Sequence, residues 1–268
     1  MGTVSRLIDM SGRVVIVTGG AGYIGRAIGD AFMELGAIVI ATDISQAGLD
    51  AYAKTTAAGN LDGTLETAVL DLEDEAAIRQ FCSDVEERHG IVSSIIHNAG
   101  FVGTAASEGW ATPFDTQSSE LWRRAIEVNL TAPFVMTQAL TPALKKSSHG
   151  SVVMVGSIYG LVGPDWRMYA GTSLGNPAAY AASKGGLMQF TRWLSTTLAP
   201  DIRVNAFCPG GLERGQDEKF LEKYNARTPM GRMGTPEDMV GAAVFLACDL
   251  SAYVTGQVIA VDGGWTAW

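Results

Sequence analysis

The sequence has few cysteines, and they are not clustered. Its 3 cysteines, Cys82, Cys208 and Cys248, lie far apart and form no CxxC motif or Cys/His group. This spacing excludes a disulfide framework and offers no ligand set for zinc. We therefore expect no metal site, and three reduced thiols in the core of a cytoplasmic protein.

Positive charge and long apolar runs are also scarce. The chain has 19 Lys and Arg against 28 Asp and Glu, a net charge of −9, so it lacks the basic surface of a nucleic-acid-binding protein. Residues 1–10 contain no hydrophobic signal segment, and the longest apolar stretch, 239–248, is too short to cross a bilayer. We expect a small-molecule substrate, and neither a nucleic-acid nor a membrane partner.

What the sequence does have is an alternation of short β-branched runs and longer helical segments. The runs are apolar throughout, which is typical of parallel strands covered on both faces. We predict an α/β fold: one doubly wound, Rossmann-like parallel sheet of seven strands in a single domain, residues 1–268, with ligands at the carboxyl ends of the strands. The runs lie at 14–17, 38–40, 68–70, 95–96, 152–155, 202–204 and 258–261, and the helical segments at 25–35, 75–89, 121–145, 178–198 and 236–248.

Two segments show no helical periodicity. Residues 159–177 are rich in Gly and aromatic residues and predict a long loop, and loops of this length are usually functional. Residues 211–235 are polar and Gly-rich, which predicts a mobile flap over the site. The long loop either meets the substrate or packs on a neighbouring subunit. Its candidates for substrate contact are Asp165, Trp166, Arg167, Tyr169 and Asn176.

A glycine-rich turn follows the first strand run. Residues 18–25 read Thr-Gly-Gly-Ala-Gly-Tyr-Ile-Gly and precede a predicted helix. Small residues let the backbone approach a pyrophosphate, and the free N–H groups at the start of a helix bind its charge. Such a turn also occurs without a ligand. The residues that would contact a dinucleotide here are Gly19, Gly22, Tyr23, Ile24 and Gly25.

The second strand run ends near Asp43, where the adenosine ribose of a bound dinucleotide is expected. A carboxylate accepts hydrogen bonds from both ribose hydroxyls and repels the 2′-phosphate of NADP. We therefore expect NAD as the cofactor, although Arg26 is near enough to leave NADP open. The alternative for Asp43 is an ordinary solvated loop acid.

Tyr180 and Lys184 form the candidate acid/base pair. Of the 7 tyrosines, Tyr180 alone has a lysine four positions later, inside a helical segment. Residues four apart share a helix face at about 5–6 Å, so the ammonium can lie beside the phenol and favour its anion. An ordinary phenol has a pKa near ~10, so a second cation, the oxidised nicotinamide ring, is needed to bring it near neutrality. The alternative is a tyrosine packed on the sheet beside a solvated lysine.

Together with these residues, several dispersed motifs give the chain a resemblance to the short-chain dehydrogenases/reductases that covers nearly its whole length. The resemblance implies an NAD-dependent oxidoreductase that transfers hydride between NAD(H) and a secondary alcohol or ketone. It also implies a homotetramer or homodimer that pairs through the long helices after the fourth and fifth strands. The motifs, in the order of the family, are residues 18–25, Asp71-Leu72, Asn98-Ala99-Gly100, Asn129, Ser157, Tyr180-x-x-x-Lys184, Pro209-Gly210 and Asp262-Gly263-Gly264.

The same resemblance implies roles for individual residues. Ser157 hydrogen-bonds the reacting oxygen, and Tyr180 exchanges its proton. Lys184 binds the nicotinamide ribose and lowers the pKa of Tyr180, while Asn129 holds a water that connects Lys184 to solvent. The remaining contacts to the cofactor are the adenine (Asp71 and Leu72), the ribose (Asn98, Ala99 and Gly100) and the nicotinamide (Pro209 and Gly210).

The chain departs from the compact branch of the family at three places. Tyr23 occupies a position that is usually Gly, a spacing found in the extended branch with its sugar-nucleotide epimerases, although the other motifs fit the compact branch. The separation of Ser157 and Tyr180 exceeds the usual spacing, and the extra residues fall in the predicted long loop. Arg214 stands where many members have a Thr that contacts the cofactor phosphate, and either serves that phosphate or points at the substrate.

Aromatic faces and hydrogen-bonding groups in the long loop favour a sugar, a polyol or another polar hydroxy compound as substrate. Two alternatives remain. One is a sugar-nucleotide epimerase or dehydratase that uses NAD catalytically, and the other is a dinucleotide-binding protein without catalysis. The presence of Ser157, Tyr180 and Lys184 argues against the second alternative.

Overall fold

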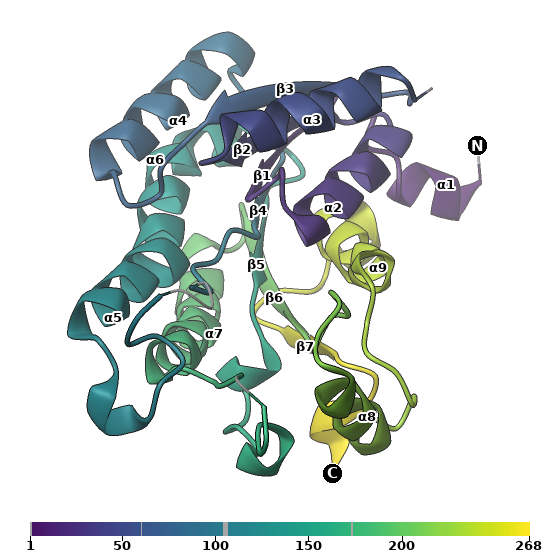
Figure 1. The fold of residues 1–268 in the computed structure, drawn as a ribbon. Coiled ribbons are helices and arrows are strands. Elements are labelled where there is room, and N and C mark those ends of the chain that lie inside the picture. The colour runs from purple at the N-terminus through teal and green to yellow at the C-terminus, as the bar shows by residue number, and fades with distance from the viewer. Residues whose placement is uncertain (1, 60, 104–106, 173) are drawn as a thin grey trace.

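Seven parallel strands form one sheet with helices on both faces (Figure 1). The computed structural model describes residues 2–59, 61–103, 107–172 and 174–268. The strand order is β3-β2-β1-β4-β5-β6-β7 and every neighbouring pair is parallel, which confirms the predicted doubly wound α/β fold. The strands are β1 (Val14–Thr18), β2 (Ile38–Asp43), β3 (Thr64–Val69), β4 (Ser94–His97), β5 (Ser151–Val155), β6 (Arg203–Pro209) and β7 (Val258–Val261).

The helices form a layer on each face of the sheet, and each layer has its own hydrophobic core. Two separate cores are what apolar strand runs without alternation require, because both faces of such strands must be covered. One layer consists of α2 (Tyr23–Glu34), α3 (Gln46–Ala57) and α9 (Pro236–Ala247), and the other of α4 (Glu75–His89), α6 (Ala132–Lys146) and α7 (Ala178–Leu198). The remaining helices are α1 (Thr3–Leu7), α5 (Ser119–Ile126) beside α7, and α8 (Glu218–Arg227).

The predicted strands and helices differ from the structure mainly at the periphery. Strand β3 begins at Thr64, earlier than the run predicted at 68–70, because this edge strand alternates polar and apolar residues. Helices α4 and α7 have the predicted bounds. Asp74 caps α4 by accepting a hydrogen bond from the Ala77 N–H at 3.0 Å, and Gly90 ends the helix with φ = 71°.

The segment 121–145, predicted as one helix, is helical along its whole length, but it is not α-helical throughout. Helix α5 ends at Ile126, and a π-helical turn, Glu127–Thr131, separates it from α6. A single π-turn widens the helix locally and changes which side chains face inward, and such turns are frequent at functional sites. The turn contains Asn129, one of the predicted site residues, which is buried.

The carboxyl ends of the strands meet at one edge of the sheet (Figure 1). β1 lies between β2 and β4, so the connections after β1 and β4 leave the sheet toward opposite faces. A crevice opens at such a switch point, and ligands of doubly wound sheets bind there. The segments that follow β1 to β6 therefore contribute residues to one cleft.

Candidate active site

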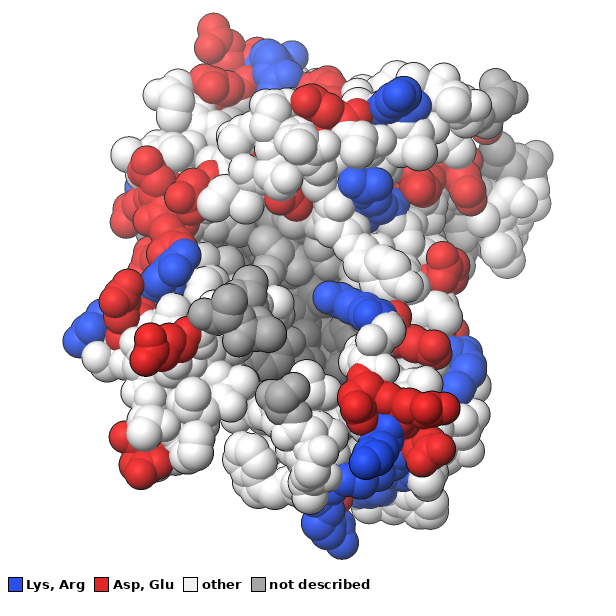
Figure 2. Space-filling model, in the orientation of Figure 1, with Lys and Arg blue, Asp and Glu red and all other residues white. Residues whose placement is uncertain are grey.

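A cleft of about 660 Å³ opens at the carboxyl ends of the strands. Figure 2 shows it as a hollow near the middle of this face, with basic side chains reaching its rim. Its size is in the range of roughly 300–1,000 Å³ that holds small molecules and cofactors. The predicted site residues that line it are Gly19, Gly22, Tyr23, Ile24, Asp43, Asp71, Leu72, Asn98, Ala99, Gly100, Ser157, Tyr180, Lys184, Pro209 and Gly210.

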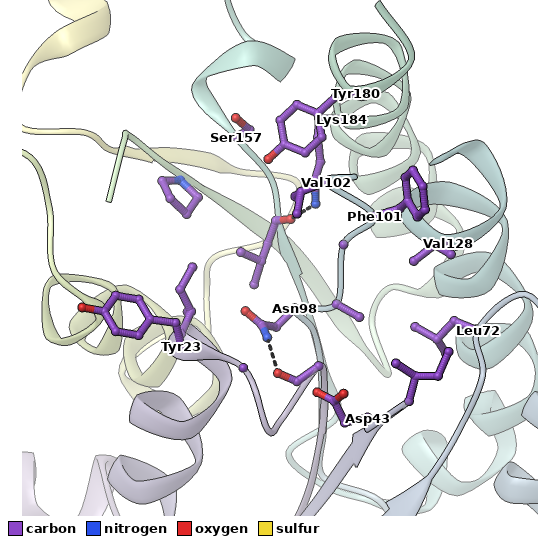
Figure 3. Close-up of a pocket in the computed structure, with 18 of the residues that line it drawn as sticks. Tyr23, Asp43, Leu72, Asn98, Phe101, Val102, Val128, Ser157, Tyr180 and Lys184 are labelled. Atoms are coloured by element: carbon purple, nitrogen blue, oxygen red, sulfur yellow. Dashed lines mark hydrogen bonds between the residues drawn. The ribbon is translucent and has the colours of Figure 1, made fainter. Parts of the chain in front are cut away.

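The glycine-rich turn between β1 and α2 leaves no room for larger side chains. A Cβ on Gly25 would lie 2.2 Å from the Gly19 carbonyl oxygen, and one on Gly19, where φ is 62°, would lie 2.9 Å from the Ala99 Cα. The turn therefore brings bare backbone to the cleft, and the first N–H groups of α2 have no partner within the helix. Tyr23, the departure from the family pattern, fits because its side chain is half exposed and lies away from Ser157 and Tyr180 (Figure 3).

Asn98 braces this turn from the neighbouring strand. Its side-chain amide donates hydrogen bonds to the carbonyl oxygens of Thr18 at 2.9 Å and Gly19 at 3.1 Å (Figure 3). The backbone N–H groups of Asn98 and Ala99 both donate to the Thr18 hydroxyl. The segment 98–100 thus positions the turn as well as lining the cleft.

Asp43 ends β2 at the rim of the cleft. One of its carboxylate oxygens accepts a hydrogen bond from the Ala21 N–H at 3.2 Å, and the other from the Ser45 N–H at 3.0 Å. Arg26 does not line the cleft. Its guanidinium donates to the carbonyl oxygens of Ala21 at 2.8 Å and Gly48 at 3.0 Å, so it is committed to the backbone on the helix side of the turn.

Ser157, Tyr180 and Lys184 are brought together by β5 and α7. Ser157 follows the end of β5, and the other two lie one turn apart near the start of α7. Figure 3 shows the three side chains grouped on one side of the cleft, across from Tyr23, Asn98 and Asp43. Lys184 donates from Nζ to the Val155 carbonyl oxygen at 2.8 Å, and Nζ lies 5.9 Å from the centre of the Tyr180 ring.

Burial shifts both titratable groups of this set. It lowers the pKa of the Lys184 ammonium to about 8. It also raises the pKa of the Tyr180 phenol, while a hydrogen bond with Ser157 and the positive charge of Arg214 act to lower that pKa. The sequence predicts that Lys184 lowers the pKa of Tyr180, but in the structure the cation whose charge acts to lower this pKa is Arg214.

Asn129 connects three segments around this group. Its side-chain oxygen accepts a hydrogen bond from the Phe101 N–H at 2.6 Å, and its amide donates to the Ser183 hydroxyl at 3.0 Å and the Phe101 carbonyl at 3.3 Å. A Cβ placed on Gly100 would lie 3.6 Å from both the Asn129 oxygen and the Lys184 Nζ, so the two polar groups flank this glycine. Asn129 therefore ties the loop after β4 to α7, next to Lys184.

The long loop 159–177 and the flap 211–235 pack on each other. The hydroxyls of Tyr159 and Tyr169 hydrogen-bond to each other, and the Tyr169 ring lies 5.8 Å from Phe220 of α8. Tyr224 of the same helix stacks on Trp265 at 4.4 Å. Much of the predicted flap is thus the helix α8, held by the loop through aromatic contacts.

The five loop residues proposed for substrate contact are not among the described residues that line the cleft. Asp165 instead pairs with Arg167 at 2.7 Å on the surface, and Trp166 is exposed. The sequence missed other lining residues, because a residue that faces a cleft carries no periodic signal of that position, whether it lies in a loop or in a helix. They include Ile44, Leu70, Glu73, Phe101, Val102, Arg124, Val128, Val155, Gly156, Leu212 and Gln216.

The cysteines and the wider surface add no second site of the kinds considered from the sequence. The three cysteines are buried and unpaired. In the part of the chain that the structure describes, no group of three or more His, Cys, Asp or Glu side chains could hold a metal ion. No described helix is both long and apolar enough to span a bilayer.

Every described residue that lines the cleft lies within sequence shared with known proteins. A family model described as Enoyl-(Acyl carrier protein) reductase matches residues 19–266. The chain belongs to the short-chain dehydrogenase/reductase family. This confirms the family predicted from the dispersed motifs. This short-chain dehydrogenase/reductase is therefore an oxidoreductase.

Relatives and solved structures of the family match the whole length of the chain. The 3-oxoacyl-[acyl-carrier-protein] reductase of Thermotoga maritima is 36% identical over 262 residues, covering 95% of this chain and 98% of the relative. The structure of a putative NAD(P)-dependent gluconate 5-dehydrogenase from Beutenbergia cavernae, with bound NADP, has a TM-score of 0.86 at 33% identity and covers 98% and 100% of the two chains. A short-chain dehydrogenase from Leptospira borgpetersenii with bound NAD+ has a TM-score of 0.84 at 32% identity, covering 99% and 96%.

Proposed function

We propose that this protein is an NAD-dependent oxidoreductase that transfers hydride between NAD(H) and a secondary alcohol or ketone of a sugar, polyol or other polar hydroxy compound. The observation that carries the proposal is the grouping of Ser157, Tyr180 and Lys184 on one side of a cleft whose other side is the glycine-rich turn. The names of similar proteins, which include reductases of carrier-bound ketones and gluconate dehydrogenases, favour this function over the epimerase alternative.

The residues of the cleft fit a nicotinamide dinucleotide. The start of α2 offers free N–H groups to a pyrophosphate, and Asp43 lies where the ribose is expected. The glycines of the turn carry no side chains that would block the pyrophosphate or the ribose. The other proposed contacts are those expected from the sequence, with Asp71 and Leu72 at the adenine, 98–100 at a ribose and 209–210 at the nicotinamide. A bound dinucleotide supplies the hydride acceptor or donor.

The chain supplies the proton transfer. In the oxidative direction, the Tyr180 Oη takes the hydroxyl proton of the alcohol, whose oxygen is held by a hydrogen bond from Ser157. Lys184 holds a positive charge next to Tyr180 and passes the proton on toward solvent. Asn129 lies beside Lys184 on the route that the proton takes. In the reductive direction, Tyr180 donates the proton to the carbonyl oxygen.

The preference for NAD rests on two side chains. Asp43 places a carboxylate at the rim of the cleft where the 2′-phosphate of NADP would lie, and the two negative charges would repel each other. Arg26, the residue that left NADP open in the sequence analysis, is held by two backbone carbonyls and lies outside the cleft lining.

We further propose that residues 1–268 act as one catalytic domain, covered by the loop and the flap. Copies of the chain would pair through α6 and α7, where Phe134 and Trp193 are exposed.

A panel of sugars, polyols and hydroxy acids assayed with NAD and with NADP tests the proposed function. We expect NAD-dependent absorbance of reduced nicotinamide with at least one class. Tyr180→Phe removes the proton-transferring hydroxyl and should lower kcat by about 100-fold or more, while the Kd for NADH, measured by fluorescence, changes little. Near-wild-type turnover by Tyr180→Phe would overturn the catalytic assignment.

A further inference from the structure

Arg214 is an exposed residue that lines the cleft, and its side chain lies between the start of α2 and the loop after β6. It lies in the loop that follows β6 and lines the cleft together with Ser157 and Tyr180. Its guanidinium carbon lies 5.3 Å from the centre of the Tyr23 ring, so the side chain reaches across the mouth of the cleft toward the start of α2. Its positive charge is felt at the Tyr180 phenol, where it acts to lower the pKa.

The backbone that carries Arg214 is fixed by its neighbours. The Gln216 side chain accepts a hydrogen bond from the Arg214 N–H at 2.7 Å and donates one to the Leu212 carbonyl at 2.6 Å. Glu213 donates its N–H to the Gly234 carbonyl at 3.0 Å, which anchors the turn to the end of the flap. The turn is thus braced from both sides, and the arginine side chain projects from it at a defined place.

The other cations that line the cleft are already engaged. Lys184 donates to the Val155 carbonyl, and Arg124 forms an ion pair with Glu73 at 2.8 Å. Arg214 forms no ion pair with any residue in the described part of the chain. Arg214 is exposed, so water meets the donors of its guanidinium, and an anion that enters the cleft can replace this water.

The carboxylates of the cleft lie at its other end. Asp43 ends β2, Asp71 and Glu73 follow β3, and no other acid is among the described residues that line the cleft. The cleft is therefore negative where a sugar ring of the cofactor binds and positive where the substrate binds. The pyrophosphate between them is served by the N–H groups of α2, so the guanidinium remains for the substrate.

We propose that Arg214 binds a carboxylate of the substrate, which makes the substrate a hydroxy acid or keto acid. This inference rests on the proposed function and narrows its class of polar hydroxy compounds. A carboxylate matches the two parallel donors of a guanidinium and is held in a fixed orientation. The reacting carbon is thereby placed at Ser157 and Tyr180, and a neutral polyol of the same length lacks this anchor.

Paired substrates test the proposal. D-Gluconate has a carboxylate where D-glucitol has a hydroxymethyl group, so the two form one pair. Each of the other hydroxy acids is paired with its amide. In wild type we expect a lower KM for the acid of each reactive pair. Arg214→Gln should raise the KM for acids by about tenfold or more, with a much smaller rise for the neutral partners, and Arg214→Lys should recover part of the loss. Arg214→Gln should also move the pH profile of kcat upward, because a positive charge near Tyr180 is lost.

Lys219→Gln is the matched control, since it removes the same charge from an exposed position of α8 that does not line the cleft. Calorimetric titration of the acids into the wild-type and Arg214→Gln enzymes with NADH present gives a readout independent of turnover. We expect acid binding to weaken about tenfold in Arg214→Gln and to stay at the wild-type value in Lys219→Gln.

Three results would overturn the proposal. One is an Arg214→Gln variant that loses NADH affinity and affects acids and neutral partners alike, which assigns the guanidinium to the cofactor phosphates. Another is a wild-type enzyme that oxidises neutral alcohols through Tyr180 and shows no preference for acids, in which case the proposed function stands. The third is equal acid binding by wild type and Arg214→Gln in the titration, which overturns the inference whatever the turnover. If no alcohol or acid reacts at all, the proposed function itself fails.

Discussion

At the residue scale, the cofactor preference depends on which neighbours each side chain already serves. Asp43 is held by the N–H groups of Ala21 and Ser45, which keep its carboxylate at the rim of the cleft. Arg26 donates to two carbonyl oxygens on the opposite side of the same turn. The sequence predicts the position of Asp43 from its distance to the glycine turn, but not the orientation of Arg26, because that depends on the Gly48 carbonyl of α3 as well as on the Ala21 carbonyl of the turn.

Replacing Asp43 tests this preference. Asp43→Asn keeps a hydrogen-bond acceptor and removes the charge, so we expect the ratio of kcat/KM with NAD to that with NADP to fall about tenfold. Asp43→Ala should lower the ratio further through loss of the ribose contact. Asp50→Ala, an exposed acid on α3, serves as the control for net charge. An unchanged ratio in both Asp43 variants would show that this carboxylate does not select the cofactor.

At the element scale, the sequence predicts best those segments that are capped and regularly amphipathic. Helix α4 has its Asp74 cap and its terminal Gly90, and the predicted bounds are correct. Helices α3 and α8 were not predicted, because each buries only two large side chains and is otherwise polar. The π-turn Glu127–Thr131 was missed for another reason. Hydrophobic periodicity records which residues are buried and not how the backbone is bonded, so Asn129 was identified from the family resemblance alone.

Asn129→Ala tests the contribution of this turn. The substitution leaves the Phe101 N–H without an acceptor and removes the hydrogen bond donated to the Ser183 hydroxyl, which keeps its own bond to the Tyr180 carbonyl. It should lower the free energy of unfolding by about 2–3 kcal/mol. Denaturation in urea measures the change. Asn225→Ala on α8 is the control, since the buried side-chain oxygen of Asn225 has no hydrogen-bond partner in the described structure. Equal losses in the two variants would contradict the structural role given to Asn129.

At the scale of the whole molecule, the strand order and the position of the cleft follow from sequence patterns, whereas the cover of the cleft does not. Apolar strand runs separated by helices predict a doubly wound sheet, and that topology places ligands at the strand ends. The contacts of Tyr169 with Phe220 and of Tyr224 with Trp265 join segments that are distant in sequence. Local patterns contain no information about such pairs, so the loop and the flap were predicted as separate features.

The buried charge of Lys184 affects the stability of the whole fold. Its side chain is 3% exposed, and its pKa of about 8 lies below the ordinary value of 10.5. Keeping this buried group protonated at neutral pH therefore lowers the stability of the folded state, by on the order of 3 kcal/mol. Because the unfolded chain binds the extra proton between pH 8 and pH 10.5, the cost is present below pH 8 and disappears as the pH rises through that window.

Lys184→Met should therefore raise the thermal midpoint at pH 7 by a few degrees while abolishing catalysis, even though the hydrogen bond to Val155 is lost. The advantage over wild type should shrink between pH 8 and pH 10.5. Thermal unfolding followed by circular dichroism across this range measures both effects. A midpoint below that of wild type at pH 7 would show that the charge of Lys184 is well compensated in the folded state.

The aromatic packing around α8 also limits how this enzyme can be re-engineered. Tyr169 of the long loop packs on Phe220 of α8, and Tyr224 of α8 stacks on Trp265, so three stretches of chain share one aromatic cluster. Transfer of the long loop alone into a relative would expose its aromatic rings to water, because the rings of α8 and Trp265 that they pack against would be missing. The transferable unit is the three stretches together, and exchange of specificity between family members through this region requires moving them as one cassette.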